Sequence, residues 1–304
     1  MNKIGIQSGI LYDDTSFEQG MEIVKAAGFD CIDFNIDTKV NIREISKGAK
    51  DEFFTKSDDE LKEYYRPQKE LFDKLGLEMS QMHGPFPVYD AENQAATDVI
   101  YNATVKCLML CEYFGCPYLV VHPAVGKDAQ NEKEINMYIY KRLVPAAKKY
   151  GVGICLENMF TGKDGHIIEA VCSDITQTCE FIDELNEFAG EKIFSFCYDL
   201  GHATLLGKNI KRSIVQLGDR LTVLHIHDNN GLNDIHMQPF SQTRSHGWVT
   251  DWEGFIDGLK AIDYKGVLSF ETFNSLVSLP KELHPAMVNY IGAVGKFFAD
   301  RLAR

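Results

Sequence analysis

The chain has no long hydrophobic run, and this absence limits the surroundings that the protein can occupy. A membrane-spanning helix needs about 20 apolar residues in succession, and none of the 304 residues lies in such a run. The segment from Met1 to Ile6 leads directly into a strand-like pattern and lacks the apolar core of a secretory signal peptide. We therefore expect a cytoplasmic location and no membrane partner.

Paired cysteines are also missing. The chain has eight cysteines but no C-x-x-C pair, so neither a zinc-thiolate site nor a disulfide framework is indicated. Cys155 and Cys197 lie within apolar runs, and Cys107 and Cys111 are one helical turn apart. These positions are typical of buried free thiols in a reducing compartment.

Basic residues are fewer than acidic ones. The chain has 31 Lys and Arg residues against 44 Asp and Glu residues, which gives a formal net charge of −13. Proteins that bind nucleic acids usually present a basic stripe to the phosphates. The charge balance therefore predicts that nucleic acid is not a partner.

The sequence shows no linker and no low-complexity tract, so we expect a single domain over residues 1–304. Strand-like and helix-like segments alternate from end to end, eight of each. This alternation predicts an α/β fold of the (β/α)8 TIM barrel class. A doubly wound sheet would need a glycine-rich phosphate loop after the first strand, and Gln7-Ser8-Gly9-Ile10-Leu11 is not one. The expected strands are 3–8, 30–35, 77–83, 118–122, 153–158, 193–199, 221–227 and 266–271, and long loops, 36–59 and 228–251, follow the second and the seventh.

Nine residues that can bind a metal or move a proton lie at or just after the ends of these apolar runs. They are His83, His122, Glu157, Asp199, His202, His225, Asp234, His236 and Glu271. A parallel barrel brings the carboxyl ends of all its strands to one mouth. The sequence therefore predicts that these side chains meet in one site.

Four of the nine end consecutive strands, the fifth to the eighth: Glu157, Asp199, His225 and Glu271. Three carboxylates and one imidazole suit a divalent cation such as Mn²⁺, Mg²⁺, Co²⁺ or Zn²⁺. Without a cation, the converging carboxylates would repel one another. We expect these four residues to share one metal ion.

Several short motifs at the strand ends resemble one known family. They are His83-Gly84-Pro85-Phe86, Val121-His122-Pro123, Leu156-Glu157-Asn158, Asp199-Leu200-Gly201-His202-Ala203, His225-Ile226-His227-Asp228, Asp234-Ile235-His236-Met237-Gln238-Pro239 and Phe270-Glu271. In this order and placement they resemble the xylose isomerase-like barrels. That superfamily includes sugar isomerases, ketose 3-epimerases, inosose dehydratases and type IV AP endonucleases. The resemblance extends over essentially the whole chain.

The resemblance implies a metal-dependent sugar isomerase or epimerase. It assigns the metal to Glu157, Asp199, His225 and Glu271, and acid/base catalysis to the two glutamates on opposite faces of a sugar or polyol-ketone substrate. Removal of a proton from the carbon beside a carbonyl gives an enediolate. This reaction needs an electrophile on the carbonyl oxygen, here the metal ion, and a base beside the C–H bond, here a glutamate. The same resemblance implies that His202 hydrogen-bonds a substrate hydroxyl or orients a glutamate.

Three alternatives remain open. All nine positions also match the residues that hold up to three Zn²⁺ ions in the AP endonuclease branch, so His83, His122, Asp234 and His236 are candidates for additional metal or substrate binding. A dehydratase or lyase could use the same enediolate chemistry. A barrel that binds a sugar or a partner subunit without turnover is the third alternative, but it would not need two opposed glutamates.

Further residues are candidates for substrate contact. Phe86, His246 and Trp248 are expected to line the pocket, whereas Trp252 suits either the pocket or helix packing. We expect His227 to point away from His225, on the other face of the strand. A homo-oligomer is compatible with the fold, because barrels often pair through their helices.

Overall fold

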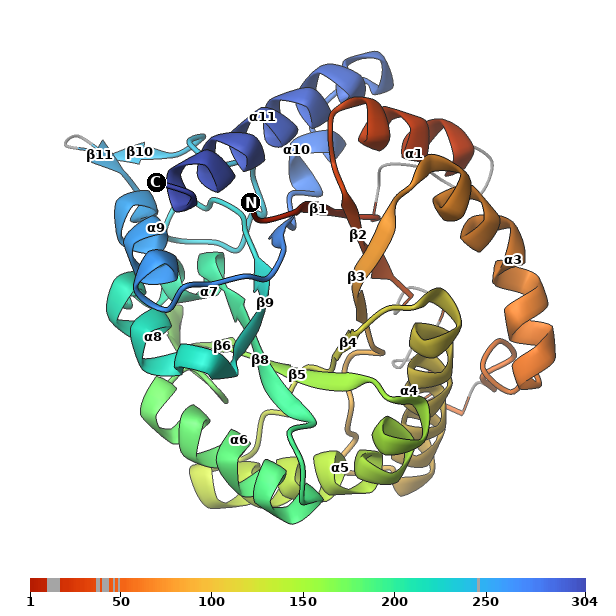
Figure 1. Cartoon of the computed structure of the whole chain (residues 1–304). Helices are drawn as coiled ribbons and strands as arrows, with labels where there is room; N and C mark the ends of the chain where they lie inside the picture. The colour runs from red at the N-terminus through yellow and green to blue at the C-terminus, as the bar shows by residue number, and fades with distance from the viewer. Residues whose placement is uncertain (10–16, 37–38, 40–43, 46, 49, 245–246) are drawn as a thin grey trace.

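The computed structural model is an eight-stranded parallel barrel enclosed by helices (Figure 1). It describes residues 1–304 except 10–16, 37–38, 40–43, 46, 49 and 245–246. The strands run in the order β12-β1-β2-β3-β4-β5-β8-β9, and an isolated parallel bridge between Ile226 and Phe270 closes the ring. The strands are β1 (Ile4–Gln7), β2 (Cys31–Asn35), β3 (Glu78–His83), β4 (Tyr118–Val120), β5 (Gly153–Glu157), β8 (Phe194–Asp199), β9 (Leu221–His225) and β12 (Leu268–Phe270).

The barrel predicted from the alternating pattern is confirmed. Eight helices follow the eight strands: α1 (Phe17–Ala26), α3 (Asp58–Leu75), α4 (Gln94–Phe114), α5 (Ala129–Tyr150), α6 (Ile175–Ala189), α8 (Ile210–Leu217), α9 (Trp252–Ala261) and α11 (His284–Leu302). Short helices lie between them: α7 (Leu200–Leu205), α10 (Asn274–Val277), η2 (Gly218–Arg220) and η3 (Lys281–Leu283). Within the described part of the chain, no helix is long and apolar enough to cross a membrane.

The first and last strands predicted from the apolar runs are longer than those observed. The strand expected at 266–271, for example, is paired only over Leu268–Phe270. Its last residue, Glu271, lies at the mouth of the barrel, where the chain turns out of the ladder. Glu271 therefore follows its strand, whereas His83, Glu157, Asp199 and His225 are the last residues of theirs.

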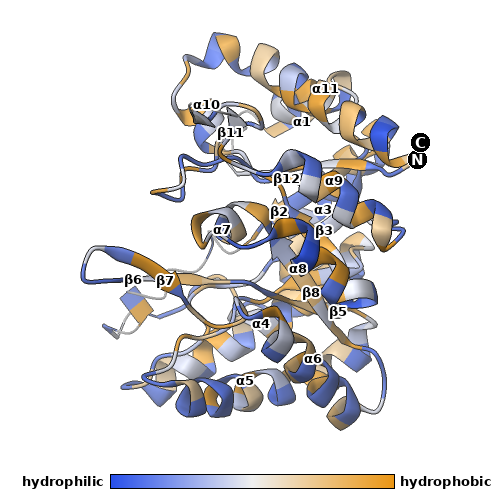
Figure 2. Ribbon diagram, turned by 90° about the vertical axis from the view of Figure 1, so that its left-hand side faces the viewer, coloured by the Kyte–Doolittle hydropathy of each residue, from blue (hydrophilic) through white to orange (hydrophobic). Residues whose placement is uncertain are grey.

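Among the described residues, two β-hairpins lie in the loops that follow β5 and β9. β6 (Phe160–Lys163) pairs with β7 (His166–Glu169), and β10 (Thr243–Arg244) pairs with β11 (Gly247–Trp248). Figure 2 shows the β6–β7 hairpin extending from the end of the barrel opposite to the two chain termini. The first hairpin is absent from the prediction, which left the segment after the fifth strand without structure.

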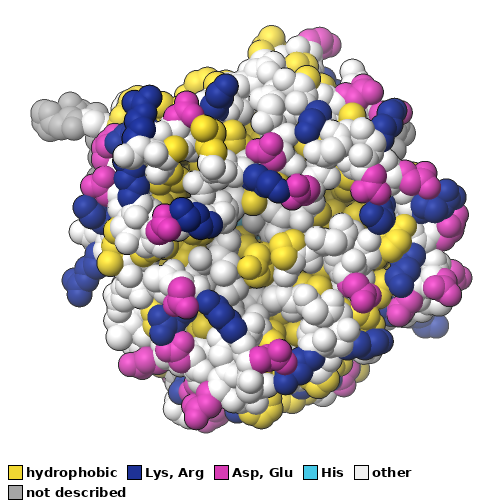
Figure 3. Space-filling model, viewed as in Figure 1, with side chains coloured by type: hydrophobic (Ala, Val, Ile, Leu, Met, Phe, Trp, Pro, Cys, Tyr) yellow, Lys and Arg dark blue, Asp and Glu magenta, His cyan; other side chains and the backbone are white. Residues whose placement is uncertain are grey.

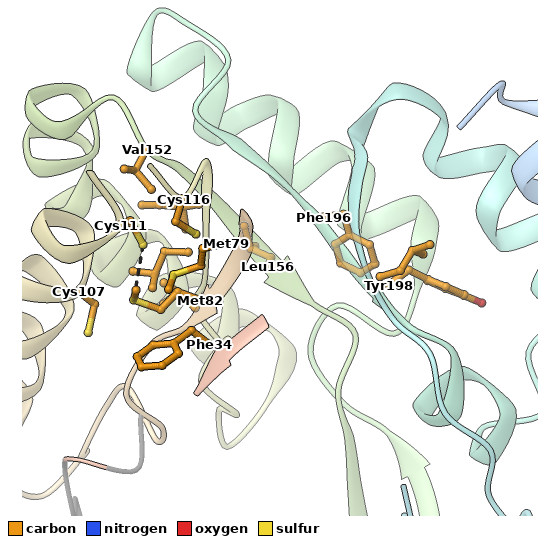
Figure 4. Packing of buried hydrophobic residues seen from close by; sticks show 14 of the residues in the cluster. Phe34, Met79, Met82, Cys107, Cys111, Cys116, Val152, Leu156, Phe196 and Tyr198 are labelled. Carbon is orange, nitrogen blue, oxygen red and sulfur yellow. Dashed lines mark hydrogen bonds between the residues drawn. The ribbon is translucent and has the colours of Figure 1, made fainter. Parts of the chain in front are cut away.

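The core lies between the outer faces of the strands and the helices. Figure 4 shows part of it, where Met79 and Met82 of β3 face Cys107 and Cys111 of α4. The sulfurs of Cys111 and Met82 are 3.7 Å apart. All eight cysteines are free, and six of them are buried, as the absence of paired cysteines predicts.

The barrel interior is filled by a small layer of its own. Val120, Cys155, Cys197 and Val223 pack together inside the ring. Cys155 Sγ lies 3.2 Å from Ser195 Oγ. This layer forms a floor beneath the mouth, because the side chains two residues further along β5 and β8 are Glu157 and Asp199.

The opposite end of the barrel has a different character. Figure 3 shows this end, with acidic and basic side chains interspersed around a few central hydrophobic ones. A hollow of about 850 Å³ lies here, and Tyr118, Thr222, Tyr264 and Val267 contribute to its wall. None of the nine predicted site residues lines it.

Candidate metal centre

The structure brings all nine predicted residues together at the carboxyl end of the barrel. At the centre, Nδ1 of His225 lies 3.3 Å from Oε2 of Glu157 and 3.3 Å from Oε2 of Glu271. Its distance to Oδ2 of Asp199 is 3.9 Å. The four residues are buried, with Glu271 the most exposed at 9%. The four predicted ligands therefore converge around one imidazole nitrogen.

Two histidines flank this centre on one side. His122 Nε2 is 3.2 Å from Oε2 of Glu157, and His83 Nε2 is 3.6 Å from Oε1 of Glu271. Ligand atoms of His83, His122 and Glu157 all lie within 4.8 Å of one another. A second cation, or a polar group of a substrate, would fit this group.

A third group lies on the other side. His236 Nε2 is 2.9 Å from Oδ2 of Asp234, and His202 Nε2 is 3.3 Å from the same oxygen. The ligand atoms of these three residues also lie within 4.8 Å of one another. His202 is held from behind, since its Nδ1 donates to the carbonyl oxygen of Asn158 at 2.8 Å.

His227 joins this third group, which corrects the expectation that it points away. Its Nε2 is 3.1 Å from both carboxylate oxygens of Asp199, and its ring stacks on that of His236 at 4.0 Å. The expectation misapplied strand geometry, because residues two apart lie on the same face. In addition, β9 ends at His225, so His227 lies beyond the regular ladder.

The donor set fits a cation. Within the described residues, neither ring nitrogen of the buried His225 has a hydrogen-bond partner, and the same holds for Oε2 of Glu157. Buried polar atoms are rarely left without partners, and a bound cation would supply a partner for these atoms. Imidazole and carboxylate together are ligands that Zn²⁺, Mn²⁺ and Co²⁺ accept.

The charges of the cluster lead to the same conclusion. Burial alone would raise the pKa of Glu157, but the neighbouring His225 and His122 hold that pKa well below its usual range. Burial opposes protonation of His225, yet Glu271 and Glu157 raise its pKa to about 9. The negative charge of the carboxylates thus favours protonation of the neighbouring histidines. A bound cation would compensate the same negative charge.

Asp228 anchors the long loop that follows β9. Its carboxylate accepts hydrogen bonds from the backbone N–H groups of Ser241 and Gln242, both at 3.0 Å, and from Thr250 Oγ1 at 2.7 Å. The loop so fixed carries Asp234 and His236. Asp228 was not among the predicted site residues, although an acid directly after the strand expected at 221–227 is a signal for such a role.

The three residues expected to touch substrate have different outcomes. Phe86 is 49% exposed, and its ring lies 4.8 Å from that of His122, at the edge of the cluster. Trp248 is on the β10–β11 hairpin and packs against Phe240 at 5.2 Å, so its role as a pocket wall stays a prediction. His246 lies outside the described residues.

Two other aromatic residues are Trp252, which was expected either in the pocket or in helix packing, and Phe160, which was not predicted. Trp252 is 2% exposed and stacks on Phe298 of α11 at 5.6 Å, so it packs a helix and does not line a pocket. Phe160, at the start of the β6–β7 hairpin, lies 5.0 Å from the His202 ring. It was missed because the hairpin itself was missed.

Curated proteins are similar in sequence to part of the chain. An L-ribulose 3-epimerase from Methylomonas sp. is 25% identical over 195 residues, which cover 61% of this chain and 56% of that protein. An uncharacterized protein of Methanocaldococcus jannaschii is 27% identical over 218 residues, with 67% and 68% of the two chains covered. Alignments to the curated relatives thus span between 55% and 68% of their lengths.

Solved structures of related barrels cover almost the whole chain. A D-tagatose 3-epimerase-like protein superposes with a TM-score of 0.73 at 19% identity, covering 99% of this chain and 98% of its own. IolI protein with a bound zinc atom gives a TM-score of 0.68 at 19% identity, with 96% and 97% covered. The family model described as a xylose isomerase-like TIM barrel matches residues 21–289. The chain therefore belongs to the xylose isomerase-like TIM barrel family.

Proposed function

We propose that the protein is a divalent-metal-dependent sugar isomerase or epimerase that acts on a polyhydroxy carbonyl compound. The observation that carries this proposal is the convergence of Glu157 and Glu271, each 3.3 Å from Nδ1 of His225. Glu157 ends β5 and Glu271 directly follows β12, and β8 and β9 separate these two strands in the barrel. Carboxylates that reach one point from separate strands can approach different faces of a substrate held between them.

Glu157, Asp199, His225 and Glu271 would hold the cation. When bound, a divalent cation polarises the substrate carbonyl and stabilises the negative charge of an enediolate. One glutamate then removes the proton from the carbon beside the carbonyl. The other glutamate, in its protonated form, donates its own proton to the opposite face, which gives epimerisation, or to the neighbouring carbon, which gives isomerisation.

His202 would act on Glu157 in this scheme. Its Nδ1 lies 3.4 Å from Oε1 of Glu157, and the hydrogen bond to the carbonyl of Asn158 holds the ring in place. Asp199 and Asp234 raise the pKa of His202 well above its ordinary value against the effect of burial. A protonated imidazole there would favour the charged form of Glu157, which is the form that accepts a proton.

The similar proteins support a ketose as the substrate. They include sugar 3-epimerases, one of them crystallised in complex with D-allulose. Phe86 and Phe160 lie beside His122 and His202 at the edges of the cluster, and aromatic rings of this kind can pack against the C–H face of a sugar. A sugar without phosphate is consistent with a mouth lined by carboxylates.

Solvent deuterium offers the direct test. We expect the metal-loaded protein in D₂O to exchange the proton on the carbon beside the carbonyl of at least one of D-fructose, D-allulose, D-tagatose and L-ribulose, and to form the C3 epimer. Proton NMR of the sugar follows both changes in one sample. Absence of both exchange and epimer with all four ketoses would contradict the proposal for free ketoses. Loss of water from the sugar would indicate the dehydratase alternative.

A second candidate function is hydrolysis of a phosphodiester by a three-zinc centre of the AP endonuclease kind. The observation that favours it is the presence of two further ligand groups beside the central four residues, His83 with His122 and Glu157, and His202 with Asp234 and His236. A single-metal epimerase does not require both groups. The net charge of −13 opposes this candidate, because duplex binding depends on phosphate contacts by Lys and Arg.

Metal content separates the two candidates. We expect one tightly bound divalent ion per chain in protein purified without chelator, and no nicking of an abasic duplex at physiological salt. Elemental analysis by mass spectrometry and a gel assay with the zinc-loaded protein provide the two readouts. Three zinc ions per chain, together with salt-sensitive nicking that Glu271→Gln abolishes, would replace the first proposal with the second.

A further inference from the structure

A buried carboxylate that the proposed reaction does not use lies directly beside the centre. Asp33 is fully buried in β2, a strand that supplies none of the nine predicted site residues. The β2–β3 ladder shifts register between Ile32 and Asp33, so that Asp33 is opposite Gln81. Such irregularities re-aim side chains, and here the shift turns Asp33 toward the histidine cluster.

Both oxygens of Asp33 are engaged. Oδ1 lies 3.0 Å from Nδ1 of His83, and Oδ2 accepts from Nε2 of Gln81 at 3.0 Å. Oδ2 also faces Nε2 of His225 at 3.7 Å. The rings of His83 and His225 stack at 4.6 Å with an interplanar angle of 22°, so one carboxylate lies beside two parallel imidazoles.

This contact fixes the tautomer of His83. An ionised carboxylate can only accept, so the nitrogen 3.0 Å from it must carry the proton. The Asn35 amide nitrogen, 3.4 Å from the same Nδ1, is a longer contact and does not reverse this assignment. With Nδ1 protonated, the lone pair of His83 is on Nε2, the atom that faces Glu271.

The same reasoning extends to His225. Its Nε2 faces Asp33, while its Nδ1 faces Glu157 and Glu271. The negative charge of Asp33 favours the tautomer of His225 that carries its proton on Nε2. In this tautomer the lone pair is on Nδ1 and points to the three carboxylates of the proposed metal centre. The arrangement matches the general rule that a carboxylate behind a ligating histidine sets its tautomer and orientation.

We propose that Asp33 is a positioning residue that directs the lone pairs of both His83 and His225 into the metal centre. Direct ligation by Asp33 is the competing explanation, since a ligand atom of Asp33 lies within 4.8 Å of those of His83 and His225. However, ligation would compete with the hydrogen bonds that both its oxygens already accept. The inference rests on the proposed metal centre, but it does not depend on which reaction follows.

Asp33→Asn tests the inference, and Asp30→Asn is its matched control. Asp30 precedes the same strand and accepts from the backbone N–H of Ile4 at 3.0 Å, away from the cluster. We expect Asp33→Asn to bind Zn²⁺ about 10- to 100-fold more weakly than the parent, as is usual when such a carboxylate is lost. Asp30→Asn should stay within about twofold of the parent. Competition with a chromophoric chelator measures both affinities, and circular dichroism verifies that the variants are folded.

The position of the proton on each histidine ring is a second readout, and a purely structural role of Asp33 would not determine it. In ¹⁵N-histidine-labelled, zinc-loaded parent protein, we expect the proton of His83 on Nδ1 and that of His225 on Nε2, assigned with His83→Gln and His225→Gln. Protons on the opposite nitrogens, or parent-like zinc affinity in Asp33→Asn, would overturn the inference. If the parent binds zinc but converts no ketose, the proposed function fails while these two readouts still decide the role of Asp33.

Discussion

Replacement of either central glutamate by glutamine is expected to lower kcat for epimerisation by roughly 10²- to 10⁴-fold, the usual effect of losing a direct proton-transfer group. Glutamine is nearly isosteric and keeps one oxygen for a cation, but it cannot accept the proton of the sugar. Both variants, Glu157→Gln and Glu271→Gln, should show the loss, because one residue removes a proton from the sugar and the other donates a proton to it. Steady-state turnover of the ketose identified by deuterium exchange measures the effect.

Metal loss has to be separated from loss of the base, since both glutamates would also hold the cation. Each variant is therefore assayed at saturating metal, with bound metal measured in the same sample. Glu78→Gln is the control, because Glu78 pairs with Lys3 at the opposite end of the barrel and is exposed. Near-parent turnover by either central variant would exclude the two-base scheme.

The second large effect is expected from His225→Ala. His225 is the residue on which Glu157, Asp199 and Glu271 converge, so its removal deletes a proposed ligand and leaves three carboxylates in one buried site. We expect metal affinity to fall by more than about 100-fold, beyond the range for loss of a supporting carboxylate. Chelator competition gives the affinity directly.

His166→Ala provides the control for this experiment. His166 is exposed on β7, and its removal should leave metal binding unchanged. If His225→Ala bound the metal as tightly as the parent, the assignment of the four central ligands would be wrong.

The ends of the strands were the predictable part of the site. In a chain that alternates strands and helices, a short apolar run such as Leu119-Val120-Val121 predicts a buried parallel strand. The residue that follows such a run is then expected at the mouth of the barrel. That logic located His122, Glu157 and His225 without any knowledge of contacts. It could not supply distances, which depend on how the strands tilt and shift in register.

Asp33 and the β6–β7 hairpin show where the reasoning stopped. Asp33 is inside its strand, followed by Phe34 and Asn35, so a search for residues at strand ends passes over it. A charged residue within a buried strand was the available signal. For the hairpin the signal was Asp164-Gly165, both with positive φ angles of 51° and 79°, which is the dipeptide that favours a tight two-residue turn.

The seam of the barrel has a consequence for how the protein is made. β1 pairs with β12, and the bridge from Ile226 to Phe270 completes the ring, so the first strand of the barrel along the chain is a neighbour of its last. Asp33 and His83 lie in β2 and β3, which are translated before β5, β8 and β9, whereas Glu271 follows β12 and is translated after all of them. The proposed set of four central ligands therefore stays incomplete until Glu271 has been translated, and a chain that ends before Glu271 would lack one of these proposed ligands.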